Sequence, residues 1–212
     1  MTIKDKILPV IVMATLFTLA TYQQVSAQKG RAGIKGGLNI SNLYIDNVTD
    51  QNARLGFNLG VYGQVFSTET FAIQPELLYS TKGSTAQYNA GSLYQEITYN
   101  LNYLDLPVLA VFKVGESVEL HAGGYASYLL NANISYKGDL ANGSDPVDKD
   151  QLKSFDYGLS GGIGVNFSSV QVGARYNLGL VKIADTNTAR SYIGDAKNSC
   201  AQIYVAFNLS SK

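Results

Sequence analysis

The sequence predicts an all-β fold: an eight-stranded antiparallel up-and-down barrel that spans a membrane with its strands, preceded by a cleavable signal peptide. Three observations predict it. Apolar and polar residues alternate with a period of two along most of the chain after residue 28, which is typical of strands. The connections between these strands alternate between short and long, as in a barrel with tight turns at one end and long loops at the other. The polar face carries few charges, since only 15% of residues are Asp, Glu, Lys or Arg, where about 25% is usual.

The N-terminal segment has the features of a secretory signal peptide. Lys4 and Lys6 give a positively charged start, residues 7–20 form an apolar run, and residues 25–27 (Val-Ser-Ala) have the small-x-small pattern of a cleavage site. The expected division of the chain is therefore a signal peptide at 1–27 and one outer-membrane β-barrel domain at 28–212.

The composition of the mature domain excludes several classes of protein. Without the first 27 of its 212 residues, the chain keeps 185, which suits one domain. Removing the signal's two lysines and one aspartate from the 16 basic and 16 acidic residues leaves 14 against 15, which argues against a nucleic-acid partner. No apolar stretch after residue 27 approaches the roughly 18 residues of a transmembrane helix.

Each predicted strand is based on one alternating run. In the first, Ile34, Leu38 and Ile40 share one face, while Lys35 and Asn39 share the other. The later runs repeat this pattern, although the fourth is nearly continuous in its apolar part. The predicted strands cover 31–43, 56–66, 71–82, 94–114, 119–130, 154–167, 170–178 and 199–209.

The connections predict how the strands are arranged. Short turns are expected at 67–70, 115–117 and 168–169, and long loops at 44–55, 83–93, 131–153 and 179–198. With eight strands, both chain termini fall at the end with the short turns, which is the periplasmic side of an outer-membrane barrel, and the long loops are extracellular.

The composition of the polar face indicates which way it points. A sheet with one face in water normally carries many Lys and Glu residues on that face. Here that face is mostly Gly, Asn, Ser, Gln and Tyr, which suits the narrow lumen of an eight-stranded barrel, where side chains just fill the interior. Glycines at positions such as Gly158 and Gly164 would make room for larger inward groups. The apolar face would then contact lipid.

Aromatic residues on the outward face sort into two bands, as interfacial girdles require. Phe71, Phe112, Phe167 and Phe207 are expected near the short turns, and Tyr79, Tyr128 and Tyr157 toward the long loops. Phe57 does not fit this sorting, since it lies near a long loop. The alternative is a soluble, lipocalin-like barrel with ordinary aromatic residues in its core.

Several segments resemble a known family. Residues 34–41 (IKGGLNIS) resemble the opening strand of the PorT-like, porin-family outer-membrane β-barrel domain. Residues 74–83 (QPELLYSTKG) resemble its third strand, 103–109 (YLDLPVL) its fourth and 175–180 (RYNLGL) its seventh. The resemblance implies a small membrane-embedded barrel without one defined activity, and one branch of the family is tied to protein secretion.

Charged residues on the inward face predict a polar network in the lumen. Isolated charges in a low-dielectric interior are costly, whereas paired charges are tolerable. We expect Glu76 and Asp105 to pair with Lys35, Lys82 or Arg175 and so to plug the barrel; the alternative is a selectivity ring or a proton pathway. The predicted network comprises Lys35, Glu76, Lys82, Asp105, Lys113, Asp156 and Arg175.

No catalytic, metal or cofactor site is expected. His121 is the only histidine, and a catalytic role would need a serine such as Ser127 or Ser160 and an orienting acid beside it. A polar residue near the periplasmic end is the favoured interpretation. Cys200 has no partner cysteine, and residues 145–150 fail the spacing of a calcium loop.

The expected function is a structural or surface-interaction role in the cell envelope, in a non-enzymatic protein. The alternatives are an accessory component of an outer-membrane protein secretion system, a narrow solute pore and, least favoured, a lipid-modifying enzyme. The expected partners are outer-membrane lipid, the barrel-assembly machinery through the aromatic-rich final strand at Phe207, and envelope or secretion-system proteins.

Overall fold

Nine antiparallel strands form the fold in the computed structural model, which describes residues 30–44, 52–91, 93–147, 151–187 and 194–209. The expected signal peptide, 1–27, lies outside the described residues. The strands are β1 (Ala32–Tyr44), β2 (Asn52–Gly63), β3 (Phe71–Ala90), β4 (Leu93–Val114), β5 (Val118–Gly138), β6 (Gly143–Pro146), β7 (Phe155–Phe167), β8 (Val170–Lys182) and β9 (Lys197–Asn208). Among the described residues, no helix is long and apolar enough to cross a membrane.

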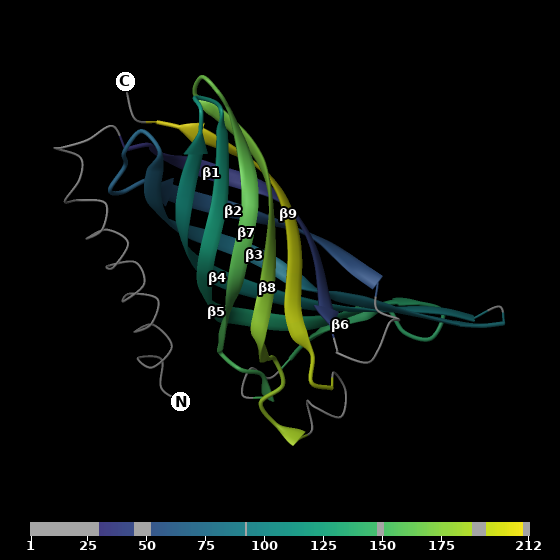
Figure 1. Cartoon of the computed structure of the whole chain (residues 1–212). Coiled ribbons are helices and arrows are strands. Elements are labelled where there is room, and N and C mark those ends of the chain that lie inside the picture. The colour runs from purple at the N-terminus through teal and green to yellow at the C-terminus, as the bar shows by residue number, and fades with distance from the viewer. Residues whose placement is uncertain (1–29, 45–51, 92, 148–150, 188–193, 210–212) are drawn as a thin grey trace.

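Eight of these strands close into a ring, which confirms the predicted fold class (Figure 1). The ring runs β1-β2-β3-β4-β5-β7-β8-β9, and β9 pairs with β1, for example at Gly33 and Asn208. The short β6 pairs only with the edge of β5. Closure leaves no free sheet edge in the ring, so its backbone groups can all pair within the wall.

Tight turns connect the strands at one end of the barrel, called here the turn end. The turns at 115–117 and 168–169 lie where the sequence predicts them, and Gly115 has the left-handed φ of 65° that favours glycine. Strand β2 ends at Gly63, slightly earlier than predicted, and Val65 continues as an isolated bridge to Ile73 before the turn at 67–70.

Strands β3, β4 and β5 are much longer than the other ring strands. They have 20, 22 and 21 residues, whereas the others have 12 or 13. The long loop predicted at 83–93 is therefore wrong: residues 83–90 continue β3, and a tight turn at Gly91 (φ 64°) leads directly into β4. Gly and Ser suggest a loop in isolation, but here every residue from 83 to 90 pairs with β4.

The loop predicted at 131–153 is wrong in part for the same reason. Residues 131–138 continue β5, and β6 follows within the expected loop. Figure 1 shows these long strands projecting beyond the barrel. We call this projecting sheet the extension, defined as residues 83–90 of β3, 93–101 of β4, 132–138 of β5, and β6.

The two faces of the barrel wall have opposite polarity. On β1, the outward Ile34 and Leu38 are 45% and 61% exposed, while the inward Lys35 and Asn39 are 1% and 0% exposed. Exposed side chains on the other ring strands include Leu59, Leu159, Ile163 and Ile203. The apolar face is thus outside and the polar face inside, as the sequence predicts.

Inward glycines leave room for the larger inward side chains. A Cβ on Gly158 would clash with the backbone carbonyl of Leu178 and lie 2.8 Å from the ring of Tyr125, and one on Gly164 would lie 2.7 Å from the amide of Gln171. Both distances are shorter than a normal carbon contact, so any larger residue would force its neighbour to move.

Aromatic pairs mark the outer surface at both ends of the barrel. Phe71 and Phe112 stack edge to face near the turn end, with ring centroids 5.5 Å apart. Toward the extension, the unsorted Phe57 packs against Tyr79 at 5.8 Å, so it belongs to that band. Tyr128 belongs to the same band, as predicted: it is 6% exposed, and its ring packs against that of the outward Phe155 at 5.2 Å.

The apolar band ends where the extension begins. On the outward face of β4, apolar residues run from Phe112 to Leu104, and the next outward residue, Asn102, bonds Asn131 of β5. This stretch spans roughly 27 Å along the strand, or about 21 Å of height at a tilt of about 40°. That height is close to the apolar band of about 25 Å in outer-membrane barrels.

Candidate functional site

The best-defined polar site lies in the middle of the lumen around Glu76 of β3. Arg175 of β8 donates two hydrogen bonds of 2.7 Å to the two carboxylate oxygens, and Lys35 of β1 lies 3.2 Å from one of them. All three residues are 3% exposed or less. Strands β3 and β8 are on opposite sides of the eight-stranded ring, four strands apart in either direction. The two-bond contact between Arg175 and Glu76, called here the paired fork, therefore spans the full width of the lumen.

Further contacts hold the same cluster in place. Gln74 donates a 2.7 Å hydrogen bond to Glu76, and the ammonium of Lys35 lies 3.5 Å from the ring centroid of Tyr204. Arg175 also lies over the Tyr204 ring, at 5.5 Å. The single carboxylate thus faces two cations, and an aromatic ring supports both of them.

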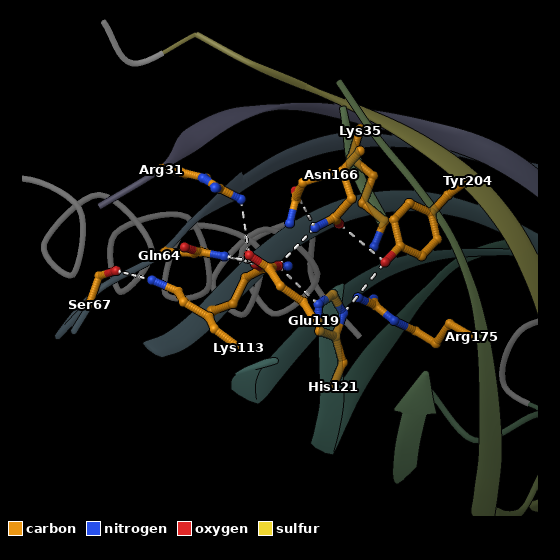
Figure 2. A network of polar contacts seen from close by, with 12 residues as sticks. Arg31, Lys35, Gln64, Ser67, Lys113, Glu119, His121, Asn166, Arg175 and Tyr204 are labelled. Atoms are coloured by element: carbon orange, nitrogen blue, oxygen red, sulfur yellow. Dashed lines mark hydrogen bonds and ion pairs between the residues drawn. The ribbon is translucent and has the colours of Figure 1, made fainter. Parts of the chain in front are cut away.

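A second polar cluster surrounds Glu119 nearer the turn end (Figure 2). Arg31 lies 3.0 Å from this carboxylate, and Gln171 and Gln64 donate hydrogen bonds to it of 2.8 and 3.3 Å. Arg31 immediately precedes β1, which is opposite β5, so this contact also crosses the lumen. Glu119 therefore closes the barrel at a second height.

His121 belongs to this second cluster. Its Nε2 lies 3.3 Å from Glu119, and its Nδ1 lies 3.4 Å from the Tyr204 hydroxyl. The serines considered as nucleophiles are engaged elsewhere, since Ser127 donates to Asp105 and Ser160 to Asn177. The structure thus does not assemble a nucleophile, a histidine and an orienting acid here.

Lys113 does not reach the lumen network in which the sequence placed it. Its ammonium donates to the Ser67 hydroxyl at 2.7 Å and to the Thr68 carbonyl at 2.9 Å, both in the turn between β2 and β3 (Figure 2). It lies at the end of β4, where the long side chain can leave the narrow lumen for the rim. Lys113 therefore fastens a turn instead of joining the plug.

A third cluster surrounds Lys82 toward the extension. Lys82 lies 3.0 Å from Asp105, and Ser127 donates a 2.6 Å hydrogen bond to the same carboxylate oxygen. The ammonium lies over the rings of Tyr103 and Tyr125, at 5.0 and 4.9 Å from their centroids. This pair joins neighbouring strands and does not itself cross the barrel.

Asp156 lies in this third cluster with polar partners. Asn198 of β9 donates to it at 2.9 Å and to the Tyr103 hydroxyl at 3.3 Å, and the Tyr125 hydroxyl donates to Asp156 at 3.3 Å. Because β9 and β4 are opposite in the ring, the contact from Asn198 to Tyr103 crosses the lumen. Cys200 is also buried on β9.

Amide side chains fill the space between the charged clusters. Asn58 and Gln202 donate to the side-chain oxygen of Asn39 at 2.6 and 3.0 Å. Sequence reasoning did not assign roles to these amides, or to Gln64, Gln74, Gln171 and Asn198. Their inward positions in the alternation were the available signal, but an amide carries no charge to indicate its partner.

Apolar side chains close the lumen above the third cluster. Leu101, Leu129, Leu152 and Ile183 are each 7% exposed or less and pack together, in a cluster that also includes Tyr103. Hydrogen bonds from Lys153 N to Ile183 O and from Ile183 N to Ala196 O, each 2.8 Å, hold two connecting segments over the mouth. We call this cluster the apolar cap. Sequence reasoning missed it because it took 131–153 and 179–198 as exposed loops.

The described residues contain no group of three or more His, Cys, Asp or Glu side chains arranged to hold a metal ion. Part of the acidic segment 145–150, namely 148–150, lies outside the described residues. The chemistry of the lumen is that of paired ions and hydrogen bonds, arranged so that side chains from opposite strands meet.

Comparisons with known proteins agree with this architecture. A family model described as an outer membrane protein beta-barrel domain matches residues 23–185. No curated protein matches the chain.

Similar solved structures include the attachment invasion locus protein Ail of Yersinia pestis, with 14% identity, 86% of this chain and 100% of that chain covered, and a TM-score of 0.47. Another is Neisserial surface protein A, with 12% identity, the same coverage and a TM-score of 0.49. Similarity at this level does not extend to function.

Proposed function

The chain belongs to the outer membrane protein β-barrel domain family, and on that premise we propose that it is a closed barrel of the cell envelope that acts through surface contacts of its extension. It lies in the bacterial outer membrane, with its apolar outer face in lipid. Its lumen does not serve as a path for solutes, and its role is structural or interactive.

The single observation that carries this proposal is the paired fork between Glu76 and Arg175. These side chains come from opposite walls and meet at 2.7 Å in the middle of the lumen. A solute pore would have to break this pair, which is 3% exposed or less and also holds Lys35. Opening such a buried pair is strongly unfavourable, so the resting barrel is closed.

The extension supports the second half of the proposal. Its outward face is polar, with pairs such as Glu96 with Lys137 and Thr98 with Ser135, unlike the apolar outward face of the barrel. A polar face cannot remain in hydrocarbon, so this sheet projects past the lipid. The tight turns of outer-membrane barrels lie in the periplasm, and the extension at the opposite end is therefore extracellular.

Single cysteines on intact cells test the placement and the surface role together, because the native Cys200 is buried. We expect Thr98→Cys in the extension to react with a membrane-impermeant maleimide, and Ser168→Cys in a short turn to stay unlabelled. A photo-reactive maleimide at Thr98→Cys should then yield adducts with envelope or surface molecules.

Adducts formed through Ser168→Cys alone would contradict a surface role and favour an accessory component of a secretion system, the function tied to a branch of PorT-like proteins. A large, steady open-channel conductance of the purified barrel in planar bilayers would contradict the closed lumen and favour a narrow pore.

A further inference from the structure

A cavity of about 470 Å³ opens beside the apolar cap, on the inner face of the extension. Most of its lining is aliphatic or aromatic, and it includes side chains from β4, β5 and the segment before β7. The residues that define it are Ile97, Tyr99, Leu101, Ile134, Tyr136 and Leu152.

The strand register explains why these side chains lie together. Ile97 pairs with Tyr136 and Tyr99 with Ile134, so these four side chains share one face of the sheet. The next inward residue along β4 is the buried Leu101 of the apolar cap, which continues this face into the lumen. The inner face therefore changes from polar in the barrel to apolar in the extension.

An apolar inner face is unexpected in the extension, which projects into water. Outside the membrane, an apolar face is expected to be buried in a core or covered by a partner. Here the side chains of Ile97, Tyr99, Ile134 and Tyr136 are only partly buried, and the space between them is hollow. The apolar cap closes the floor of the hollow, so the cavity is a blind pocket separate from the plugged lumen.

We propose that this cavity binds a hydrocarbon chain. Its volume is about three times that of a roughly 150 Å³ apolar cavity that takes one benzene, so it has room for about 15 to 20 carbon atoms. It also falls within the usual 300 to 1,000 Å³ of ligand pockets, which combine apolar walls with few polar groups. Asp145 and Gln151 are polar residues of its lining and are available to a polar head group.

The position of the cavity allows two sources for such a chain. It lies just past the end of the outward apolar band at Asn102, and the outer leaflet is therefore within reach. A free fatty acid from outside the cell has the same chemistry. Binding of a chain in the cavity does not require a surface partner, so its measurement is independent of the cysteine labelling above.

Methyl NMR of the full barrel in phospholipid nanodiscs tests the proposal, with sodium decanoate as the free-chain probe. We expect saturable shifts at Ile97, Ile134 and Ile183, which line the cavity. The lipid-facing Ile163 and Ile203 report simple partitioning of decanoate into the bilayer. In a second arm, phospholipid carrying a spin label near its chain end and no decanoate reports occupancy by a membrane lipid.

Two variants on adjacent positions of β4 provide the matched comparison. Ile97→Asn places an amide in the cavity and should weaken decanoate binding about tenfold or more, whereas Thr98→Asn on the opposite face should leave it unchanged. Thr98 also tolerates this change because its side chain lies on the polar face of the sheet.

Each outcome has a clear meaning. Saturable decanoate shifts confined to the cavity support binding of a free chain, and broadening of the cavity methyls by the spin label supports a lipid chain. Cavity methyls that shift only in parallel with Ile163 and Ile203, and that the spin label leaves sharp, would overturn the proposal. Equal binding by Ile97→Asn and Thr98→Asn would overturn it as well.

Discussion

Replacing Glu76 by Gln perturbs the lumen at its most connected point. The amide keeps the shape of the side chain but removes the charge, so Lys35 and Arg175 become two buried cations without their carboxylate. Removing one partner of a buried ion pair costs about 3–5 kcal/mol. Because two cations lose the same partner here, we expect the free energy of unfolding to fall by about 4–5 kcal/mol, or roughly a thousandfold in the folding equilibrium.

The assay is urea unfolding of the barrel in lipid vesicles, followed by the difference in electrophoretic mobility between folded and unfolded chains. Glu96→Gln makes the same chemical change on the extension, where Glu96 accepts an exposed 3.0 Å hydrogen bond from Gln87, and should lower the free energy of unfolding by about 0.5 kcal/mol or less. Replacing Glu76, Lys35 and Arg175 together by Met should recover most of the loss, since no unpaired charge remains. A loss below about 1 kcal/mol for Glu76→Gln would refute the reasoning.

Three further predictions follow, two measured on the same vesicle preparation and one on whole cells. Gly158→Val should destabilise the barrel by about 1–3 kcal/mol in urea titrations, because its Cβ would clash with the backbone carbonyl of Leu178 and lie 2.8 Å from the Tyr125 ring; an unchanged midpoint would show that the barrel is loosely packed at this position. Leu159→Arg, on the outward face, should lower the free energy of unfolding in vesicles by about 2–4 kcal/mol, whereas Thr98→Arg in the extension should leave it almost unchanged. Equal losses would argue against placing Leu159 in lipid and Thr98 in water. His121→Ala should leave the lipid profile of the cell envelope unchanged in mass spectrometry, since its partners are Glu119 and Tyr204; an altered profile would indicate a catalytic role.

The barrel itself was predictable because its signal is local. Successive residues of a strand point to opposite faces, so each face can be read from nearby residues alone. The alternation of Ile34, Lys35, Leu38 and Asn39 was therefore enough to assign an apolar and a polar face. The low charge of the polar face then indicated that it was enclosed. The short turns followed from the breaks between these runs.

The extension was predictable only in part by the same rule. Beyond Asn102 the alternation continues, but its sense is inverted, with Tyr99 and Ile97 facing inward and Asn100 and Thr98 outward. The β4 part of the extension lies within the strand predicted at 94–114, whereas its partners at 83–90 and 132–138 were placed in loops, the first because of the glycines and serines of 83–93. The change of surroundings from lipid to water produces the inversion.

The partners within the lumen depend on the geometry of the closed ring. The sequence indicated which charges point inward, but the meeting of Glu76 with Arg175 depends on the strand register and on how many strands separate them. The contact of Arg31 with Glu119 has the same origin. Lys113 shows the converse, because it pairs with Glu119 in the strand register and yet donates to the Ser67 hydroxyl and the Thr68 carbonyl at the rim.

Fluorescence quenching by brominated phospholipids tests the central claim most directly, because the chain contains no tryptophan of its own. Tyr204 and Val205 are neighbours on β9 and point in opposite directions, with Tyr204 1% and Val205 36% exposed. The account predicts strong quenching for Val205→Trp and little for Tyr204→Trp. Equal quenching of the two, or stronger quenching of Tyr204→Trp, would contradict an apolar face in lipid around a polar, filled interior.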